Sequence, residues 1–321
     1  MSNEFELVSH AQFPNLNVFL VHLLSRTPHV HRDLEIGLIL EGVMTVKLGE
    51  RSWRLEKGDL YLINSMEVHA FIAEGNGTLV LAVQVSLKLL SPFLPNAALL
   101  RFQTEPPLRG AVGPEAYEQL RRMCVELAYQ YYKRPEHHEL CCFRLIVSLL
   151  GSLEAGLPTR LLSEQDYAPI KRRTDRLVYV TDYIDQNFQR KLLLEEIADK
   201  QHLTLTYLSH LFKETLGLSF QEYLKEKRFE HAYMQLVTTE KTVLEISLES
   251  GFSDVRYMNR LFKEKLGCSP REYREQLTHV NDREKSASLE SLQHFLTEED
   301  TLSVLTQLRE TQSHIEKEDV L

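Results

Sequence analysis

The C-terminal half of this chain contains one residue pattern twice, and this repeat limits what the chain can fold into. The first copy begins at Leu194 and the second at Val243. In the aligned copies, Leu208-Ser209-His210-Leu211-Phe212-Lys213 matches Met258-Asn259-Arg260-Leu261-Phe262-Lys263, followed by Gly217 and Gly267. Each copy has the apolar periodicity of a short helix, a turn and a second helix. Two helix-turn-helix units on one chain indicate DNA binding.

The second helix of each copy carries polar side chains opposite its apolar face. We expect Thr204 to cap this helix in the first copy, and Ser253 or Asp254 in the second. Ile246 and Leu248 are predicted core residues of the second copy. The residues expected to face DNA are Thr206, Ser209, His210, Lys213, Arg256, Asn259, Arg260 and Lys263. Arginine and asparagine suit guanine and adenine edges, whereas lysines suit phosphates. The alternative, a merely solvated polar face, is weak for two copies in register.

The segment between the two copies predicts a rigid spacer. Residues 219–237 contain no proline or glycine and are rich in helix-forming residues. A helix of this length spans about 30 Å at 1.5 Å per residue. Successive major grooves on one face of DNA lie about 34 Å apart. One chain is therefore expected to place both units on one DNA site.

Residues 175–276 resemble the DNA-binding domain of the AraC/XylS family of transcription regulators. The most specific stretch is the second copy. It runs from Glu245-Ile246 through Gly251-Phe252-Ser253-Asp254 and Arg260-Leu261-Phe262-Lys263 to Gly267, Ser269-Pro270 and Tyr273-Arg274. Three positions depart from the family pattern: Ser247, Met258 and His210. The resemblance implies that bases are read by Thr206, Ser209, His210, Arg256, Asn259 and Arg260.

The N-terminal part has a different character. Between Asn15 and Leu87 the chain reads as short strands separated by glycine-rich turns, which predicts a barrel or a sandwich. Two groups, His29, His31, Glu35 and Gly42, then Gly58, Asp59 and His69, resemble the two motifs of a cupin barrel. This resemblance implies that residues 1–112 form an effector-binding domain.

The polar residues of this predicted barrel allow three interpretations. We favour contacts with a small-molecule effector by His29, His31, Arg32, Glu35, Trp53, Tyr61 and His69. A second interpretation is a manganese, iron or nickel site formed by His29, His31, Glu35 and His69, as in metal-dependent cupin enzymes. The third is structural, with both first-motif histidines on a surface loop and Glu35 paired with Arg32.

The remaining segments complete the predicted domain plan. Residues 113–156 predict a helical hairpin broken at Pro135, which caps the barrel and, by resemblance, forms a dimer interface with Leu149 on its outer seam. Residues 157–174, with Pro158 and Pro169, read as a linker. Residues 277–321 read as an acidic tail with two short amphipathic helices near 289–296 and 302–308.

Composition is compatible with this plan. A length of 321 residues allows several domains. The net charge of −9 is an average and does not exclude a local basic surface. The four cysteines show no zinc or disulfide spacing and are expected to be buried thiols. Without a membrane-spanning run or signal peptide, the chain is expected to be cytoplasmic.

The predicted fold class is therefore α+β multidomain: a cupin-like β-barrel, a helical hairpin and an all-α double helix-turn-helix domain. The predicted function is a homodimeric regulator that binds double-stranded DNA, responds to a sugar and activates a carbohydrate catabolic operon through RNA polymerase. No enzyme activity, cofactor or membrane partner is expected. The alternatives are a metal-dependent cupin enzyme or metal sensor fused to a DNA-binding domain, and a regulator with an empty barrel.

Overall fold

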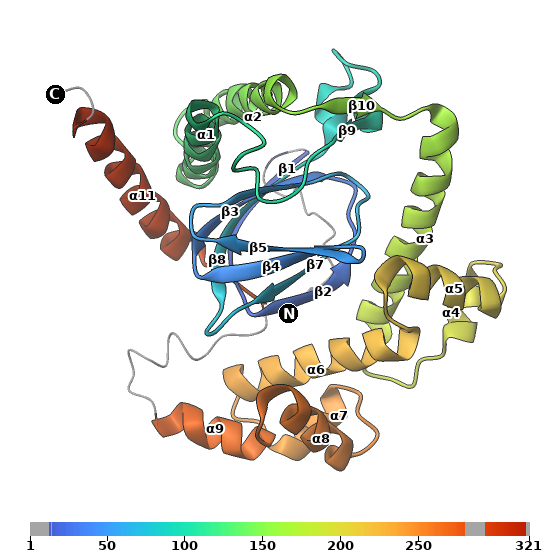
Figure 1. The fold of residues 1–321 in the computed structure, drawn as a ribbon. Helices are drawn as coiled ribbons and strands as arrows, with labels where there is room; N and C mark the ends of the chain where they lie inside the picture. Colours follow the sequence, from blue (N-terminus) through green and yellow to red (C-terminus); the bar gives the residue numbers. More distant parts are fainter. Residues whose placement is uncertain (1–12, 14, 280–292, 319–321) are drawn as a thin grey trace.

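The computed structural model describes residues 13, 15–279 and 293–318. A β-rich domain lies beside helices α1 and α2, and α3 leads from it to a group of shorter helices (Figure 1). The predicted fold class is confirmed by this arrangement of a β-domain, a helical hairpin and a C-terminal helical domain.

Two antiparallel sheets form the β-domain. One has the strand order β11-β1-β8-β3-β6 and the other β2-β7-β4-β5. Their strands are β1 (Leu16–Leu23), β2 (Ser25–His29), β3 (Leu34–Glu41), β4 (Val43–Leu48), β5 (Arg51–Glu56), β6 (Leu60–Ile63), β7 (His69–Ala73), β8 (Thr78–Val85) and β11 (Gln293–Phe295). The two sheets enclose an apolar core that includes Ile39, Met44, Tyr61 and Phe71. The ladders within the described residues do not join the sheets into a closed barrel.

Strands β3 and β8 are buried along nearly their whole length. Their inner face contacts the core between the sheets, and their outer face contacts helices α1 (Pro114–Lys133) and α2 (His138–Gly156). A strand covered on both faces needs apolar residues at nearly every position, and the sequences LEIGLILE and TLVLAVQV have them. A polar residue inside such a strand is therefore informative.

The predicted helical hairpin is present, but its outer seam was assigned to the wrong residues. Leu149 is only 1% exposed and packs in the core with Leu145 and Leu153. The exposed large apolar residues of α2 are Leu140 and Val147. The sequence of α2 is apolar on most of its circumference, so periodicity alone did not distinguish the two faces.

The predicted linker is mostly ordered structure. Strand β10 (Thr159–Leu161) pairs with β9 (Leu100–Phe102), and α3 (Glu164–Asn187) begins directly after the N-cap Ser163. Pro169 lies inside α3, although proline was expected to keep this segment irregular. The helix tolerates a proline in its second turn at the loss of one backbone hydrogen bond.

The two helix-turn-helix units have the predicted order. The first contains α4 (Leu194–Lys200) and α5 (Leu205–Leu216), the second α7 (Val243–Glu249) and α8 (Val255–Leu266), with α6 (Phe220–Thr238) between them and α9 (Pro270–His279) after them. Thr204 and Asp254 cap α5 and α8, as predicted.

Gly251, at φ +75°, lies so close to the end of α3 that a Cβ at this position would stand 2.5 Å from the Phe188 carbonyl oxygen. Leu248, predicted to be a core residue, is 64% exposed, because α7 turns Ile246 and Ser247 inward instead.

The C-terminal segment returns to the β-domain. Strand β11 pairs with the edge of β1, and α11 (Glu298–Glu318) packs along α1 with Leu305 fully buried (Figure 1). Ion pairs join Arg309 to Glu126 and Arg134 to Glu298. The tail was expected to form two short helices. Phe295 instead lies in a strand, and Leu289 and Leu292 lie outside the described residues.

Within the described part of the chain, no helix has both the length and the apolar character needed to cross a membrane.

Candidate functional site

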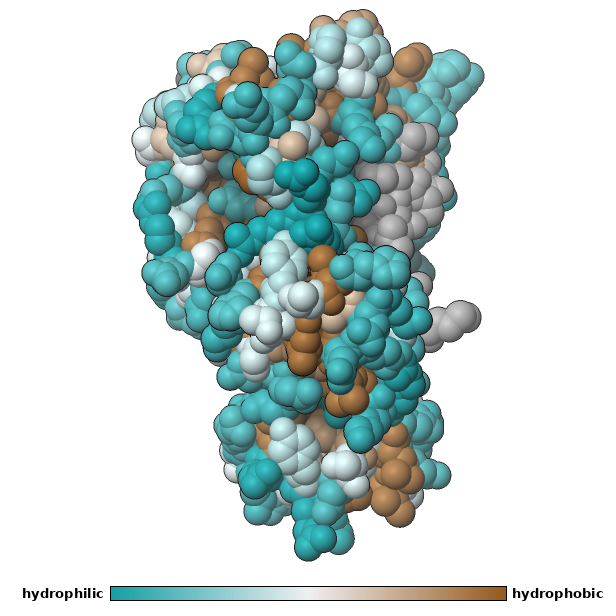
Figure 2. All heavy atoms as spheres, turned by 90° about the vertical axis from the view of Figure 1, so that its right-hand side faces the viewer, coloured by the Kyte–Doolittle hydropathy of each residue, from teal (hydrophilic) through white to brown (hydrophobic). Residues whose placement is uncertain are grey.

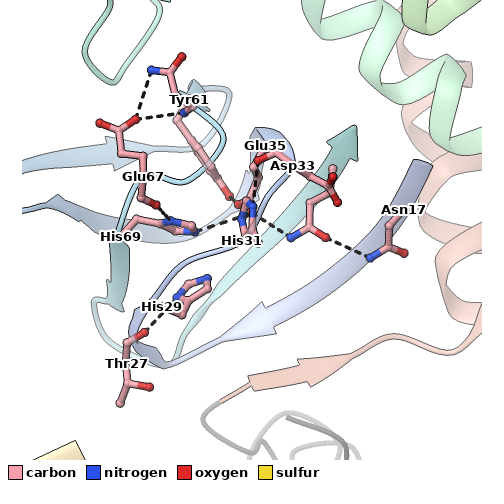
Figure 3. Close-up of polar contacts among 11 residues, drawn as sticks. Asn17, Thr27, His29, His31, Asp33, Glu35, Tyr61, Glu67 and His69 are labelled. Atoms are coloured by element: carbon pink, nitrogen blue, oxygen red, sulfur yellow. Dashed lines mark hydrogen bonds and ion pairs between the residues drawn. The ribbon is translucent and has the colours of Figure 1, made fainter. Parts of the chain in front are cut away.

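Three histidines converge at the edge of the second sheet (Figure 3). His29 ends β2 and pairs with His69, which begins β7, while His31 follows two residues after His29. One ring nitrogen from each histidine lies within 4.8 Å of the other two. The His29 and His69 ring centroids are 4.0 Å apart. The alternation of an extended chain places residues 29 and 31 on one side, as the motif spacing predicted.

Backbone carbonyls orient all three rings in the same way. The Nδ1 atoms of His29, His31 and His69 lie 3.0, 2.9 and 2.9 Å from the carbonyl oxygens of Thr27, Asp33 and Glu67. A carbonyl only accepts hydrogen bonds, so each Nδ1 carries the proton. The Nε2 atoms of His29 and His69 then face the cluster, and Nε2 of His31 is engaged with the Glu35 carboxylate. Metal-binding histidines are commonly held by this kind of outer hydrogen bond.

Glu35 lies against this cluster from β3. Its carboxylate contacts His31 Nε2 at 3.0 Å and accepts hydrogen bonds from the Tyr61 hydroxyl at 2.8 Å and Gln84 Nε2 at 3.0 Å. Burial raises the pKa of Glu35, but the hydrogen bond from His31 and the nearby histidines outweigh burial and hold the pKa well below its usual range. The Glu35 side chain is therefore a buried carboxylate.

The structural interpretation of this segment is wrong. Arg32 does not pair with Glu35; it forms an ion pair of 2.8 Å with Asp175 of α3. His31 is only 4% exposed, so it does not lie on a surface loop. Gln84 was missed by sequence reasoning, yet it left a signal, because it is a polar residue inside the buried strand β8.

The environment keeps two of the histidines neutral. Burial, and next to it the charge of Arg26, lowers the pKa of His29 well below its ordinary value. Burial, reinforced by His31, lowers the pKa of His69 to about 3. His69 Nε2 is buried and has no hydrogen-bond partner among the described residues. A buried nitrogen that lies 3.9 Å from the Glu35 carboxylate without a hydrogen bond is unusual and leaves a place for a ligand between them.

The chemistry of these donors fits a divalent transition metal. Three imidazole nitrogens and one carboxylate form a donor set suited to iron, manganese, nickel or zinc. Ligands about 2.1 Å from one ion stand at most about 4.2 Å apart, so the histidines need to move inward slightly from their present spacing. The cavity beside His29, Glu35 and Tyr61 measures about 10 Å³. This is about the room that one water molecule needs, and too little for a sugar.

Two of the predicted effector residues lie apart from this cluster. Trp53 lines an outer groove of about 720 Å³, where Arg51 lies 5.0 Å from the ring centroid. Glu67 and Val68, the two residues before His69, also line this groove. Arg32 is engaged with α3. The structure therefore brings together His29, His31, Glu35, Tyr61 and His69, while Trp53 on β5 lines a separate groove that includes the residues just before β7.

The predicted DNA-reading residues lie on the outer faces of α5 and α8. The exposed residues are Thr206, Ser209, His210 and Lys213 on α5, with Arg256, Arg260 and Lys263 on α8. Arg256 is 92% exposed and pairs with Asp254. Asn259 is half-buried, and its side-chain oxygen has no hydrogen-bond partner among the described residues. Both faces are free to meet a partner.

The β-domain contacts the first helix-turn-helix unit through the same loops that carry the histidines. Val30, between His29 and His31, is 6% exposed and packs in the core of that unit with Leu177 and Val180. Val68, next to His69, packs against the same core. Sequence reasoning missed this contact, because both valines are ordinary apolar residues.

Comparison with known proteins agrees with this arrangement. Residues 22–153 match the AraC-like ligand binding domain, and residues 197–276 match a helix-turn-helix domain. This chain belongs to the AraC family of transcription regulators. Members of this family bind DNA and a ligand and are not enzymes.

Its similar proteins include regulators that are longer than this chain. An uncharacterized HTH-type transcriptional regulator of Staphylococcus aureus (strain MSSA476) is 27% identical over 220 residues, which are 68% of this chain and 28% of that protein. The matched region thus spans little more than a quarter of that relative. The lactose operon transcription activator of Staphylococcus xylosus is 21% identical over 68% of this chain and 75% of its own length.

Some solved structures similar to this AraC-family protein match most of the chain, and others match only its C-terminal domain. ToxT from Vibrio cholerae is 14% identical, covers 81% of this chain and 97% of its own, and has a TM-score of 0.45. The C-terminal domain of the response regulator yesN from Fusobacterium nucleatum is 35% identical over 30% of this chain and 93% of its own, with a TM-score of 0.28.

Proposed function

We propose that this AraC-family protein activates a carbohydrate catabolic operon when a sugar binds its β-domain. It acts in the cytoplasm, binds double-stranded DNA through α5 and α8, and recruits RNA polymerase. The observation that carries the proposal is the pair of exposed reading faces joined to a domain with an outer groove and a polar cluster. The similarity to a lactose operon transcription activator supports a carbohydrate as the effector.

We assign the sugar to the groove beside Trp53. An indole ring stacks against the apolar face of a sugar, and the groove also contains Glu67, Gln103 and Glu105 as hydrogen-bonding partners for hydroxyl groups. Its size of about 720 Å³ suits a mono- or disaccharide, in contrast to the narrow interior. The buried pair of His31 and Glu35 then has a structural role inside the β-domain and does not contact the sugar.

One residue of the groove also contacts the DNA-binding domain. Val68 lines the groove and also packs against the core of the first helix-turn-helix unit. Met66, also in the groove, donates a backbone hydrogen bond of 2.8 Å to the His31 carbonyl, next to Val30. A sugar that holds residues 66–68 in a different position changes both valine contacts. Such differential contact is what effector control requires.

A thermal-shift panel of mono- and disaccharides tests this assignment. A sugar that binds only the folded protein raises its Tm, and the same sugar should change operator affinity. Trp53→Ala should abolish both effects, whereas Phe93→Ala, at a residue 80% exposed outside the groove, should preserve them. The assignment is refuted if no sugar shifts the wild-type protein, or if the Trp53 variant responds fully.

A second function is favoured by one specific observation, the convergence of His29, His31 and His69, with one ring nitrogen from each within 4.8 Å of the others, beside the Glu35 carboxylate. In this alternative the effector is a divalent metal held by His29, His31, His69 and Glu35, and the protein is a metal sensor or a tethered cupin enzyme. The ion would supply a charged centre that draws the three rings together. Val30 stands between His29 and His31 in the sequence, and its side chain packs in the core of the first helix-turn-helix unit. A movement of the two histidines would therefore also reach that unit.

Metal analysis separates the two candidates. Protein purified without added metal should contain about one equivalent of a transition metal if the second function holds, and His69→Ala should lose it. Absence of metal, together with no Tm change on adding manganese, iron, nickel or zinc, leaves the sugar as the effector.

A further inference from the structure

An arginine lies over an equivalent tyrosine in both helix-turn-helix units, but it comes from different elements. On α8, the Arg260 guanidinium lies 5.2 Å from the Tyr257 ring centroid, within one helix. Tyr207 is the equivalent tyrosine of α5, and His210 stands where the second copy has Arg260. The ring of Tyr207 is covered instead by Arg176 of α3, also at 5.2 Å. Helix α3 thus supplies the guanidinium that the first copy lacks.

Arg176 belongs to a basic groove beside the reading face of α5. The groove, of about 410 Å³, is lined by Arg172, Arg173 and Arg176 of α3 and by Tyr207, His210, Leu211 and Glu214 of α5. Glu214 is the acidic residue among these, and it pairs with Arg173 at 3.2 Å. Arg172 and Arg176 are one helical turn apart and face the same groove. The side of the molecule that carries α3 and α5 is predominantly hydrophilic (Figure 2).

We propose that Arg176 and Arg172 each bind a DNA backbone phosphate beside the major groove that α5 enters. A major groove is about 12 Å wide, and a helix with its side chains nearly fills it. Side chains at the flank of the reading helix therefore meet the phosphate wall rather than base edges. A guanidinium binds phosphate oxygens with two parallel hydrogen bonds. This inference rests on the proposed placement of α5 in the groove.

The contact with Tyr207 also positions the Arg176 side chain. The aromatic ring of Tyr207 holds the Arg176 side chain at the flank of α5, and its hydroxyl accepts a hydrogen bond from Arg176 Nη1. A neutral partner leaves the positive charge of the guanidinium available to an anion, whereas Glu214 already offsets Arg173. The first unit therefore combines a histidine at its reading face with two arginines at its edge.

Fluorescence anisotropy with operator and scrambled duplexes, over a range of salt concentrations, tests the proposal. Arg176→Ala should weaken binding to both duplexes alike, and the slope of log K against log salt should fall by about 1, or by about 2 for the double variant with Arg172→Ala. Arg176→Lys keeps the charge and should keep the slope. Arg54→Ala, an exposed arginine of the β-domain, is the matched control and should change neither quantity. Circular dichroism verifies that each variant is folded.

An unchanged salt slope in the double variant would overturn the phosphate contact, and so would a loss confined to the operator, which would mean base reading instead. Failure of the proposed function gives a different result. In that case Arg260→Ala also leaves the preference for operator over scrambled DNA unchanged. A slope that falls for Arg54→Ala as much as for Arg176→Ala would likewise refute the site, because it would reflect net charge alone.

Discussion

At the scale of single residues, the guanidinium of Arg260 gives the clearest expectation for DNA reading. A good bidentate contact to a base edge contributes about 1–3 kcal/mol of discrimination. Arg260→Ala should therefore lower operator affinity by roughly 5- to 150-fold, and binding to scrambled DNA much less, in anisotropy titrations at fixed salt. Lys263→Ala should weaken both duplexes equally, as a phosphate contact does. Equal losses for the arginine variant on both duplexes would exclude base reading.

The buried histidines predict a pH dependence of stability. An unfolded imidazole has a pKa near 6.5, whereas the folded chain holds the pKa of His69 at about 3 and that of His29 well below 6.5. Below pH 6.5 the unfolded chain binds protons that the folded chain does not, so the free energy of unfolding should fall from about pH 6.5 towards pH 3. Above pH 6.5 this contribution is constant.

Urea unfolding between pH 4 and 7.5 measures this effect. His69→Gln should flatten the slope, because it removes one of the groups whose pKa is lowered. His137→Gln, at a residue whose side chain is 74% exposed, is the control and should leave the slope as it is. An identical pH profile for wild-type protein and the His69 variant would contradict the assignment.

Short-range spacing was enough to predict part of the candidate site. Residues 29, 31 and 35 are close in sequence, and the regular alternation of an extended chain brings their side chains to one side. The ion pair between Arg32 and Asp175 joins residues 143 positions apart, and no local pattern contains that information. The contact between Arg176 and Tyr207 was missed for the same reason.

At the scale of secondary structure elements, neighbouring residues at the end of β2 have different partners. His29 and His31 belong to the histidine cluster, whereas Val30 between them packs in the core of the first helix-turn-helix unit. Val30→Ser should weaken this packing by about 1–2 kcal/mol and separate sensing from DNA binding. The effector should still raise the Tm, but it should no longer change operator affinity. Ile72→Ser, at an exposed residue of β7, should keep the response; an intact response in the Val30 variant would refute this route.

The α1–α2 hairpin is the element we propose for homodimer assembly, now through the exposed side of α2. Leu140 is 69% and Val147 42% exposed, whereas α11 covers part of α1. Val147→Glu should place an unpaired charge in the interface and yield a folded monomer with weaker operator binding, because two joined arms bind more tightly than one. Sedimentation velocity measures the change. A wild-type protein that is monomeric at micromolar concentration, with or without effector, would exclude this interface.

Elements were predicted well where apolar and polar residues alternate with a clear period. They were predicted poorly where nearly all residues are apolar or where a proline interrupts the pattern. Helix α8 has a clear apolar stripe of Met258, Leu261 and Phe262, and all three are buried as predicted. Helix α2 has apolar residues on several sides, so Leu149 was placed on the wrong face. Helix α3 contains Pro169 and still runs from Glu164 to Asn187, so the proline misled the prediction of an irregular linker.

At the scale of the whole molecule, the segment after the DNA-binding domain stabilises the β-domain. Truncation after His279 removes β11 and α11, and it exposes the edge of β1 and the α1 surface beneath Leu305. We expect a Tm lower by several degrees, since about 1 kcal/mol shifts the Tm of such a domain by roughly 2–4 °C. Exposed strand edges also promote association, so sedimentation should show aggregates. Truncation after Arg309, which keeps β11 and most of α11, is the control. A truncated protein with unchanged Tm would show that the tail contributes nothing.

The return of β11 to β1 also fixes the order of events during synthesis. A ribosome releases the strands β1 to β8 first, then the complete DNA-binding domain, and only afterwards the strand that covers the β1 edge. At 5–20 residues per second, about 200 residues separate β8 from β11, which amounts to roughly 10–40 s. During this interval the sensing sheet has an open edge. The nascent chain is therefore expected to need a chaperone more than the finished protein does.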